Sequence, residues 1–510
     1  MPGRRDARRR QPARHSGPAD SASRAGPGKS AAPRRHADLP RRTAYDVLAA
    51  VADREAYANL LLPRLLAERH LTGRDAALAT ELAYGTLRGL GTYDAVLAAC
   101  SDRPLDKLDP PVLQVLRLGA HQLLATRVGS HAAVATSVDL AKAVAGPRVS
   151  GYVNAVLRRV STRDLDQWLA IVATAPDSDP DGYLAVRYSY PRWIIGAYRE
   201  ALGEAAEREL VPALAAGNER PRVTMAAFPG GGPSRDEIMP DGAEPTRWSP
   251  FGFTLPAGDP SALIATGNAA VQDEGSQLAA LALARAPLAE SPAAEATAGD
   301  AAPDGTPRPH HDELWLDMCA GPGGKARLLQ ALAATTTGAR VVAGDIHPHR
   351  AELVREALAR SGNDYAVLVA DGQRPPWRDG QFDRVLVDVP CSGLGALRRR
   401  PEARWRKSES DLPALAELQR ALLRSALAAC RPGGVVAYVT CSPVSAETRD
   451  VVTAVAGSTP DVEILDAPAV LPDVPDLRSL TPLFAQLWPH RHGTDAIFIA
   501  LLRRAAEPRT

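Results

Sequence analysis

From Glu313 onward, short apolar runs rich in β-branched residues alternate with helical segments. Runs of this kind, flanked by Gly or Pro, are typical of parallel strands that are covered on both faces. We expect strands at 314–316, 341–343, 366–369, 382–387, 433–439 and 496–502, and helices at 325–334 and 350–360. The alternation predicts a doubly wound α/β sheet of the Rossmann-like kind. Ligands of such sheets bind just past the carboxyl ends of the strands.

Two cysteines stand at such strand ends. Cys391 lies in the segment 388–393 (Asp-Val-Pro-Cys-Ser-Gly), and Cys441 lies in the segment 440–443 (Thr-Cys-Ser-Pro). A lone Cys after a strand is usually just a small buried hydrophobic residue. Two of them, both downstream of a glycine-rich loop, favour thiolate chemistry at a nucleotide base.

The glycine-rich loop lies between the first expected strand and its helix, where glycines let the backbone approach a ligand and the helix N-terminus adds positive potential. It matches neither a Walker loop nor a strict G-x-G-x-x-G. Asp345 follows the second strand, where it could bind ribose hydroxyls, and Asp371 follows the third strand, where it could flank an adenine edge. Each aspartate alone could also be a helix cap or a turn former. Together the three loops predict an adenosine-type cofactor. The candidate cofactor residues are Cys319, Ala320, Gly321, Pro322, Gly323, Gly324, Lys325, Asp345, Asp371 and Asp388.

The composition indicates a soluble, cytoplasmic protein. The chain has 510 residues, enough for about three domains, and 45% of them are hydrophobic. Five cysteines without close pairing and the lack of a signal-peptide core fit a reducing compartment. No run approaches the roughly 20 apolar residues that a membrane span requires, so we expect no membrane association.

The chain divides into four expected parts. Residues 1–42 hold twelve Lys or Arg and three Asp, so their net charge is +9 and the remainder of the chain carries −8. We expect these residues to form a disordered basic tail, which either contacts phosphates or is merely solvated. Apolar residues at helical spacing predict an all-α domain over 43–165. A linker and small α+β module over 166–260 follows, including a helix from Trp193 to about Leu210. The catalytic domain is expected over 261–510, with a flexible insertion at 286–310.

Two basic segments follow Cys391. Residues 398–401 and 404–407 offer phosphate contacts, with Trp405 available for stacking on a base, although a solvated charged face is the alternative. The histidine pairs at 347 and 349 and at 490 and 492 lack a Cys or carboxylate cluster, so we expect no metal site.

These motifs carry a specific resemblance. The segments 317–325, 388–393 and 440–443, together with 271–277 and 488–495, resemble S-adenosylmethionine-dependent RNA cytosine-5 methyltransferases, and the helical part resembles the antitermination factor NusB. The combination is similar to the bacterial Sun/RsmB-type small-subunit rRNA methyltransferases. It implies a class I methyltransferase domain, preceded by a NusB-like RNA-binding domain and the small module. Two departures, Ala496 where relatives often have Gly and Gly321 where Ala is common, put no chemistry in doubt.

The resemblance also implies residue roles. Cys441 is matched to the nucleophile that adds to carbon 6 of cytosine, and Cys391 to the residue that assists release of the carbon 5 proton. Asp388 is matched to hydrogen bonding at the cytosine ring, the Pro390 carbonyl could hold the exocyclic amine, and Lys325 completes the catalytic set. The implied cofactor is S-adenosyl-L-methionine, the implied product 5-methylcytosine in 16S rRNA, and ribosome assembly intermediates are further candidate partners.

Other functions remain open at this stage. A tRNA substrate is compatible with the same chemistry, although the NusB-like domain favours rRNA. A noncatalytic RNA-binding assembly factor would be expected to have lost Cys391, Cys441, Asp388 or Lys325. A cysteine hydrolase is less favoured, because no His has a clear orienting partner.

Overall fold

A computed structural model describes residues 38–54, 56–230, 232–256, 260–289, 313–360 and 364–506. Most of the expected basic tail and of the expected insertion at 286–310 lies outside these residues. Two of the predicted boundaries, the end of the basic tail and the start of the insertion, nevertheless differ from the structure. Helix α1 begins at Leu39, so residues 39–42 belong to the helical domain. Ala286 is buried and the Ala289 amide donates to the Gly433 carbonyl, so residues 286–289 still pack on the catalytic domain.

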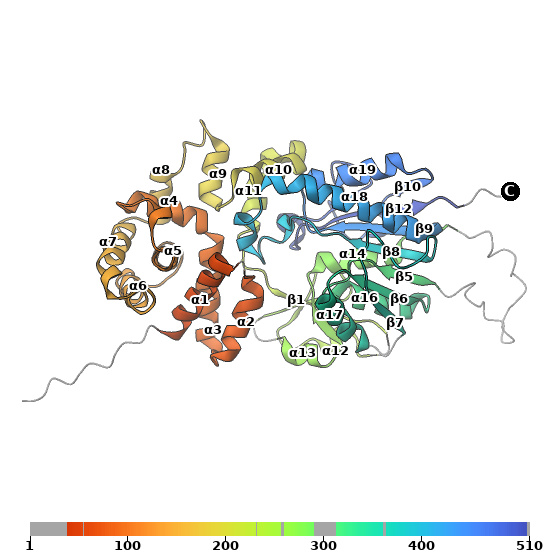
Figure 1. The fold of residues 1–510 in the computed structure, drawn as a ribbon, viewed down its shortest axis with the longest axis horizontal. Helices are drawn as coiled ribbons and strands as arrows, with labels where there is room; N and C mark the ends of the chain where they lie inside the picture. Colours follow the sequence, from red (N-terminus) through yellow and green to blue (C-terminus); the bar gives the residue numbers. More distant parts are fainter. Residues whose placement is uncertain are drawn as a thin grey trace, which may run out of the picture. The chain divides into compact units, whose positions relative to one another are not determined.

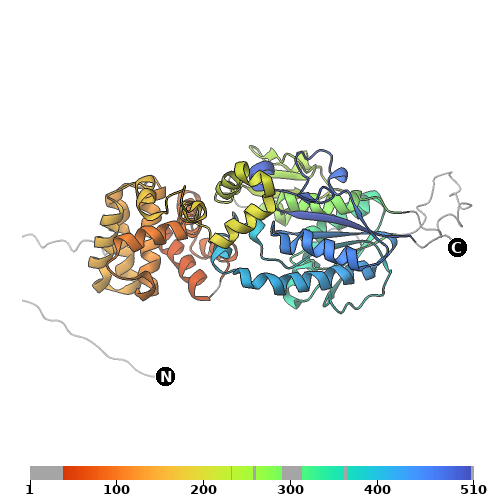
Figure 2. The ribbon, with the colours of Figure 1, turned by 90° about the horizontal axis from the view of Figure 1, so that it is seen from above.

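The N-terminal domain is all-helical (Figure 1, Figure 2). Its helices are α1 (Leu39–Arg54), α2 (Ala58–Glu68), α3 (Gly73–Arg88), α4 (Leu90–Cys100), α5 (Pro110–Ala125), α6 (Ser130–Ala145) and α7 (Ser150–Val160). Two prolines open α5, where the missing N–H groups cost nothing. The apolar faces meet in one core around Leu48, Leu82, Val115 and Leu157.

The connecting region consists of α8 (Leu165–Val172), α9 (Pro180–Tyr188), α10 (Arg192–Leu202) and α11 (Ala206–Ala216). The single helix expected through Leu210 is wrong. Gly203, with a φ of +57°, ends α10, and a 3-10 turn leads into α11. This left-handed conformation suits glycine and interrupts the helix.

A small antiparallel sheet follows, in the order β2-β3-β1-β4. Its elements are β1 (Val223–Ala227), α12 (Arg235–Ile238), β2 (Glu244–Pro245), β3 (Gly252–Leu255), α13 (Ser261–Ala265) and β4 (Ala269–Val271). A small α+β module was expected here, but the sheet extends past the expected limit of residue 260, because β4 pairs with β1. None of the described helices of the chain combines the length and apolarity of a bilayer span.

The catalytic domain contains the expected doubly wound sheet, with strand order β10-β12-β9-β8-β5-β6-β7. The strands from β5 to β9 are parallel, and β12 pairs antiparallel with β9. The strands are β5 (Leu314–Asp317), β6 (Arg340–Asp345), β7 (Tyr365–Val369), β8 (Phe382–Asp388), β9 (Cys430–Thr440), β10 (Val462–Leu465), β11 (Ala485–Gln486) and β12 (Phe498–Arg504). The helices are α14 (Glu274–Arg285), α16 (Gly324–Thr336), α17 (Pro348–Ala359), α18 (Leu412–Ala429), α19 (Arg449–Ser458) and α20 (Pro489–His492). The predicted fold class is confirmed.

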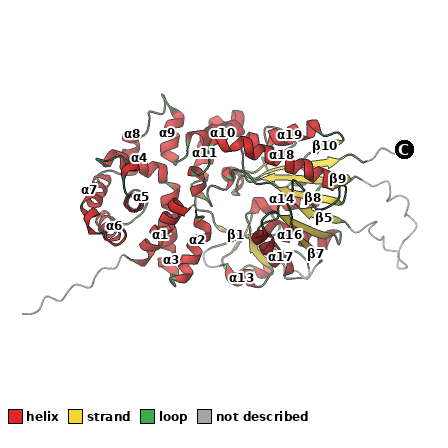
Figure 3. Ribbon diagram, in the orientation of Figure 1, coloured by secondary structure: helices red, strands yellow, loops and turns green. Residues whose placement is uncertain are grey.

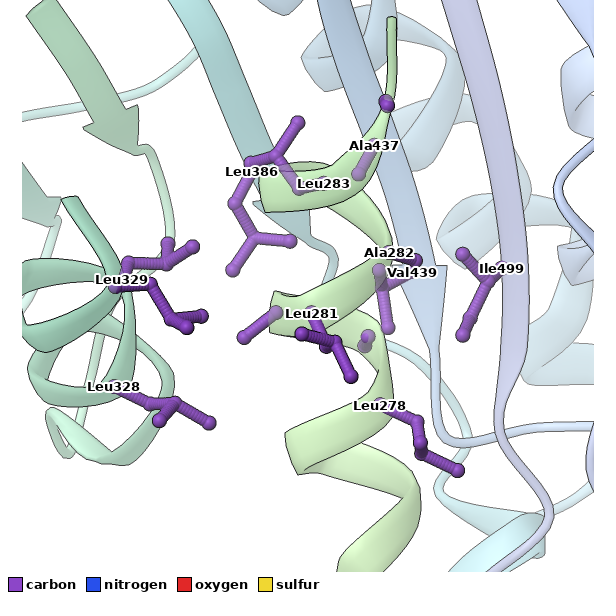
Figure 4. Packing of buried hydrophobic residues seen from close by; sticks show 14 of the residues in the cluster. Leu278, Leu281, Ala282, Leu283, Leu328, Leu329, Leu386, Ala437, Val439 and Ile499 are labelled. Carbon is purple, nitrogen blue, oxygen red and sulfur yellow. The ribbon is translucent and has the colours of Figure 1, made fainter. Parts of the chain in front are cut away.

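Helices cover both faces of this sheet (Figure 3). Ala437 and Val439 of β9 pack in the cluster formed with α14 and α16, around residues such as Leu281 and Leu329 (Figure 4). Val436 and Tyr438, which alternate with them, pack in the cluster formed with α18 and α19. Successive strand residues point to opposite faces, so a strand buried on both sides must be apolar throughout. From β5 the chain proceeds through β6 to β7 on one side of the sheet, whereas β8 pairs with the other edge of β5. The direction of strand order therefore reverses between β5 and β8, where a ligand crevice is expected.

Candidate active site

The two cysteines meet at the carboxyl ends of β8 and β9. The parallel register pairs Asp388 with Val439, so the loops that follow these two strands lie side by side. The sulfur atoms of Cys391 and Cys441 are 3.4 Å apart, within hydrogen-bonding distance. The hydrogen bond with Cys441, together with burial, raises the pKa of the Cys391 thiol well above its usual value. Both effects favour the protonated form of Cys391.

Lys325 lies beside this pair. Its ammonium group donates to the Asp388 carboxylate over 2.7 Å, and only 14% of the lysine side chain is exposed. Burial lowers the pKa of Lys325, but the charge of Asp388 and the hydrogen bond to it outweigh burial, with a smaller contribution from Cys441, and the pKa is raised overall. A cation is thus fixed near Cys441, as thiolate chemistry requires.

The glycine-rich loop connects β5 to α16. The Ala320 amide donates to the Gly344 carbonyl over 2.8 Å, and the Gly321 amide donates to the Asp345 carboxylate over 3.1 Å. Gly323 has a φ of +109° and directly precedes α16, so the backbone turns sharply with Lys325 in the first helical turn. The loop of residues 319–325 therefore spans from the end of β5 to the edge of the cysteine site.

Four aspartates lie near enough to the partly buried Cys319 thiol to affect its ionisation. Burial raises its pKa, and the charges of Asp317, Asp388, Asp345 and Asp371 raise it further. The predicted cofactor residues on four different loops are therefore brought together.

Asp345 and Asp371 also have structural roles. Asp345 accepts from the His347 and Gly321 amides, and Asp371 accepts from the Gln373 amide over 2.9 Å, as in a turn-forming aspartate. Both aspartates therefore act as cap or turn residues, which was the alternative to ligand binding. Because each carboxylate has further acceptor positions, it can also bind a ligand.

Asp317 was part of the predicted loop motif but was given no separate role. It is 1% exposed, and neither of its oxygens has a hydrogen bond of normal geometry within the described chain. Burial and the charge of Asp388 raise its pKa to about 8, against the opposing effects of Lys325 and the Cys319 amide. A buried acceptor of this kind fits a ligand that supplies donors.

One residue of the site escaped the sequence analysis. Glu447 is fully buried and accepts hydrogen bonds from Ser392, Ser442 and Gln419. The Gln419 amide also donates to the Pro390 carbonyl over 2.9 Å, so the carbonyl assigned to the exocyclic amine already has one partner. Glu447 lies six positions after Cys441, and no periodic pattern along the chain links it to the loop of Cys391.

The interpretation of Arg398 and Arg399 as phosphate contacts is wrong, and so is the alternative of a solvated face. Both side chains form ion pairs with Asp273 and Asp495, at nitrogen–oxygen distances between 2.6 and 3.1 Å. The carboxylates are 7–8% exposed, so the four charges form a buried network. This network was missed in the sequence analysis because the arginines and their carboxylate partners are about a hundred residues apart.

The second basic segment is also structural. Arg404 is fully buried and donates to the carbonyls of Arg88, Ser189 and Gly217 and to the Tyr190 hydroxyl. Arg406 donates to the carbonyls of Val51 and Ala56.

Trp405 and Glu402 complete these contacts. Trp405 is 40% exposed, but its ring lies so close to Gly91 that a side-chain carbon there would clash. Glu402 accepts from the Ala58 amide at the start of α2. The segment 401–406 therefore attaches the helical domain and the connecting helices to the catalytic domain.

The histidines of α20 also have protein partners. His490 contacts the Glu209 carboxylate, and His492 bonds to the Trp488 amide and the Pro475 carbonyl. Within the described ranges, no group of three or more His, Cys, Asp or Glu side chains is arranged to hold a metal ion.

The fold and the cysteine site define a class of protein, an α/β methyltransferase with an appended helical domain. Comparison with known proteins narrows the class. The sequence model described as 16S rRNA methyltransferase RsmB/F matches residues 306–503, and the NusB family model matches residues 38–162. A Mycobacterium tuberculosis protein named as a methyltransferase is 47% identical, over 92% of this chain and 98% of its own length. Ribosomal RNA small subunit methyltransferase B of Pseudomonas putida is 32% identical, over 92% of this chain and 99% of its own length.

The chain belongs to the RsmB/F family of 16S rRNA methyltransferases. The same fold occurs in a crystal structure titled PH0851, with a TM-score of 0.71 and 21% identity, covering 91% of this chain and 98% of that one. The predicted family resemblance, including the NusB-like domain, is confirmed.

Proposed function

We propose that this protein transfers the methyl group of S-adenosylmethionine to carbon 5 of a cytosine in small-subunit rRNA, through a covalent cysteine adduct. The observation that carries the proposal is the pair of thiols 3.4 Å apart, next to the Lys325–Asp388 ion pair. Two adjacent cysteines suit a reaction that needs one nucleophile and one group that handles a proton.

The residues around the glycine-rich loop fit the cofactor. S-adenosylmethionine carries an ammonium group, a sulfonium and ribose hydroxyls, so it brings donors and positive charge. The Asp317 carboxylate lacks a normal hydrogen bond, and Asp345 and Asp371 lie on the following two loops. These three carboxylates and the backbone of residues 319–324 would hold the cofactor, which when bound supplies an electrophilic methyl group.

The chain's own residues would act on the base in sequence. Cys441, as thiolate beside the Lys325 ammonium, forms a bond to carbon 6, and the electron pair of the carbon 5–carbon 6 double bond moves toward carbon 5. Asp388 accepts a hydrogen bond at the ring edge and stabilises the adduct. Carbon 5 takes the methyl group and then loses its proton to a base. The electron pair of the carbon 5–hydrogen bond re-forms the double bond, which expels the Cys441 thiolate.

Cys391 is assigned to the release step. Its sulfur touches Cys441, so it lies next to the bond that must break. A thiol that keeps its proton can give that proton to the departing sulfur and, as thiolate, take up the carbon 5 proton directly or through water. The helical and small domains would select the RNA site, in the cytoplasm, on free rRNA or on assembly intermediates.

The test is transfer of labelled methyl from S-adenosylmethionine to unmodified small-subunit rRNA, with tRNA and no RNA as comparisons, followed by nucleoside digestion. We expect 5-methylcytidine in rRNA only. Cys441→Ala should abolish transfer, whereas Cys391→Ala should leave a protein–RNA adduct that survives denaturing electrophoresis. Label in tRNA would overturn the substrate, label on another atom would overturn the chemistry, and exchanged phenotypes would reverse the two cysteine roles.

A further inference from the structure

The buried carboxylate of Glu447 forms hydrogen bonds to both cysteine loops. Glu447 ends the 3-10 turn of residues 445–447 and has no exposed surface. In the described part of the chain it has no ion-pair partner. A buried charge without a counter-ion is costly unless hydrogen bonds replace its water.

Four donors serve this carboxylate. One oxygen accepts from the Ser392 amide at 2.7 Å and from the Gln419 side-chain amide at 3.1 Å. The other accepts from the Ser392 hydroxyl at 2.5 Å and the Ser442 hydroxyl at 2.7 Å. The set of donors fully satisfies a charged carboxylate, and hydrogen bonds to an ionised acceptor are the strong ones.

The donors stand next to the reacting groups. Ser392 directly follows Cys391, and Ser442 directly follows Cys441. Gln419 reaches from α18 to both Glu447 and the Pro390 carbonyl, directly before Cys391. The two loops are joined further by the serine hydroxyls, 3.2 Å apart. The carboxylate therefore fixes one loop relative to the other.

We propose that Glu447 is a positioning residue that holds Cys391 beside Cys441 and keeps Cys391 in its thiol form. This inference deepens the proposed function and rests on it for the roles of the two cysteines. A fixed negative charge close to a thiol disfavours ionisation of that thiol. In agreement, the Glu447 charge is among the causes that raise the pKa of Cys391, after the Cys441 hydrogen bond and burial.

Three variants separate charge from geometry. Glu447→Gln removes the charge but keeps the shape, and the serine hydroxyls can rotate to accept from its amide. Glu447→Asp keeps the charge but cannot span all four donors. Glu274→Gln is the matched control, because Glu274 is another buried carboxylate that accepts two backbone amides, those of Trp248 and Ser249.

The deciding measurement is alkylation of each cysteine by iodoacetamide as a function of pH, read by peptide mass spectrometry on the folded full-length protein. We expect the Cys391 profile to move to lower pH in Glu447→Gln, and to stay near wild type in Glu447→Asp and Glu274→Gln. We also expect kcat for methyl transfer to fall roughly ten- to a hundredfold in both Glu447 variants, with the KM for S-adenosylmethionine within about twofold.

An unmoved Cys391 profile in folded Glu447→Gln overturns the proposal, whatever happens to kcat. A kcat within twofold of wild type in both Glu447 variants also overturns it. The alkylation profile needs no methyl transfer, so it separates two failures. A shifted profile in a protein that makes no 5-methylcytidine would reject the proposed function and leave the effect of Glu447 on Cys391 standing.

Discussion

At the scale of single residues, Gly395 is held between two backbone segments of the candidate active site. Its amide donates to the Cys441 carbonyl over 2.8 Å, and its carbonyl accepts from the Ala496 amide over 2.9 Å. A side-chain carbon at Gly395 would lie 2.0 Å from the Ala496 oxygen and 2.8 Å from the Cys441 oxygen. Because both obstacles are backbone atoms, neither can rotate away.

Gly395→Ala should therefore displace the Cys441 loop. We expect a loss of about 1–3 kcal/mol in the free energy of unfolding and at least a tenfold loss of methyl transfer. Urea unfolding and the rRNA assay measure the two effects. The control is Gly457→Ala in α19, where nothing lies within 4 Å of the added carbon and a helical alanine should stabilise by up to about 1 kcal/mol. Equal behaviour of the two variants would contradict the prediction.

His121 gives the helical domain a pH dependence. It is 2% exposed, its Nδ1 bonds to the Tyr93 hydroxyl at 2.9 Å, and burial followed by the charge of Arg88 lowers its pKa to about 4. The unfolded chain, with a pKa near 6.5, binds the proton more readily. The stability that His121 confers is thus present above pH 6.5 and is lost as the pH falls toward 4, by up to about 3 kcal/mol.

The measurement is the free energy of unfolding between pH 7 and 4, for wild type and His121→Gln. Glutamine can still accept from Tyr93 but does not titrate, so its curve should be flatter in this window. Identical slopes for the two proteins would show that His121 does not titrate as the structure implies.

Sequence reasoning found those site residues whose signal is local. Cys391 and Cys441 each follow an apolar strand, and Lys325 follows three residues with two glycines, so their positions were readable. Glu447 was not, because its role depends on Ser392, which is 55 positions away. A buried hydrogen bond of that separation leaves no pattern along the chain.

At the scale of elements, the network of Arg398, Arg399, Asp273 and Asp495 ties the N-terminus of α14 to the segments after β8 and before β12. Removing one partner of a buried ion pair leaves an uncompensated charge and typically costs about 3–5 kcal/mol. We expect a loss of that size for Asp495→Asn, measured by urea unfolding, with little sensitivity to salt.

The control is an exposed pair in the same sheet. Glu463 on β10 bonds to Arg503 on β12, and 57% of the Glu463 side chain is exposed. Glu463→Gln should cost less than about 1 kcal/mol, and the difference should shrink further with added salt. A small loss for Asp495→Asn would mean that the network relaxes around the missing charge.

The elements of the sheet were predictable, and the segments between them were not. Every expected strand has its counterpart among β5 to β9 and β12, because apolar strands with Gly or Pro at their ends are locally encoded. The arginines after Cys391 were misassigned for the opposite reason. Charge alone does not distinguish an RNA contact from a buried ion pair whose carboxylates lie about a hundred residues away.

At the scale of the whole molecule, Arg404 joins three parts of the chain. Its guanidinium lies 3.9 Å from the centre of the Tyr190 ring and donates to α3, to the end of α9 and to the residue after α11. Arg404→Ala would leave these carbonyls buried and unpaired, at about 1–3 kcal/mol each.

We expect Arg404→Ala to split thermal unfolding into two transitions and to make the connecting helices susceptible to limited proteolysis. Lys407→Ala, three residues further on, serves as the control and should unfold like wild type. A single unchanged transition in Arg404→Ala would show that the attachment does not depend on this side chain.

The buried position of Arg404 has a practical consequence for dividing the protein. The region that matches the methyltransferase family model begins at residue 306, after α14 and after every acceptor that Arg404 uses. A fragment cut at that boundary would lack the helix that covers one face of the sheet, would lose Asp273 from its ion-pair network, and would carry an arginine with none of its four hydrogen bonds. The recognisable catalytic sequence is thus shorter than the piece that keeps these contacts, and truncations that are meant to preserve all of them should keep the chain from about residue 38 onward.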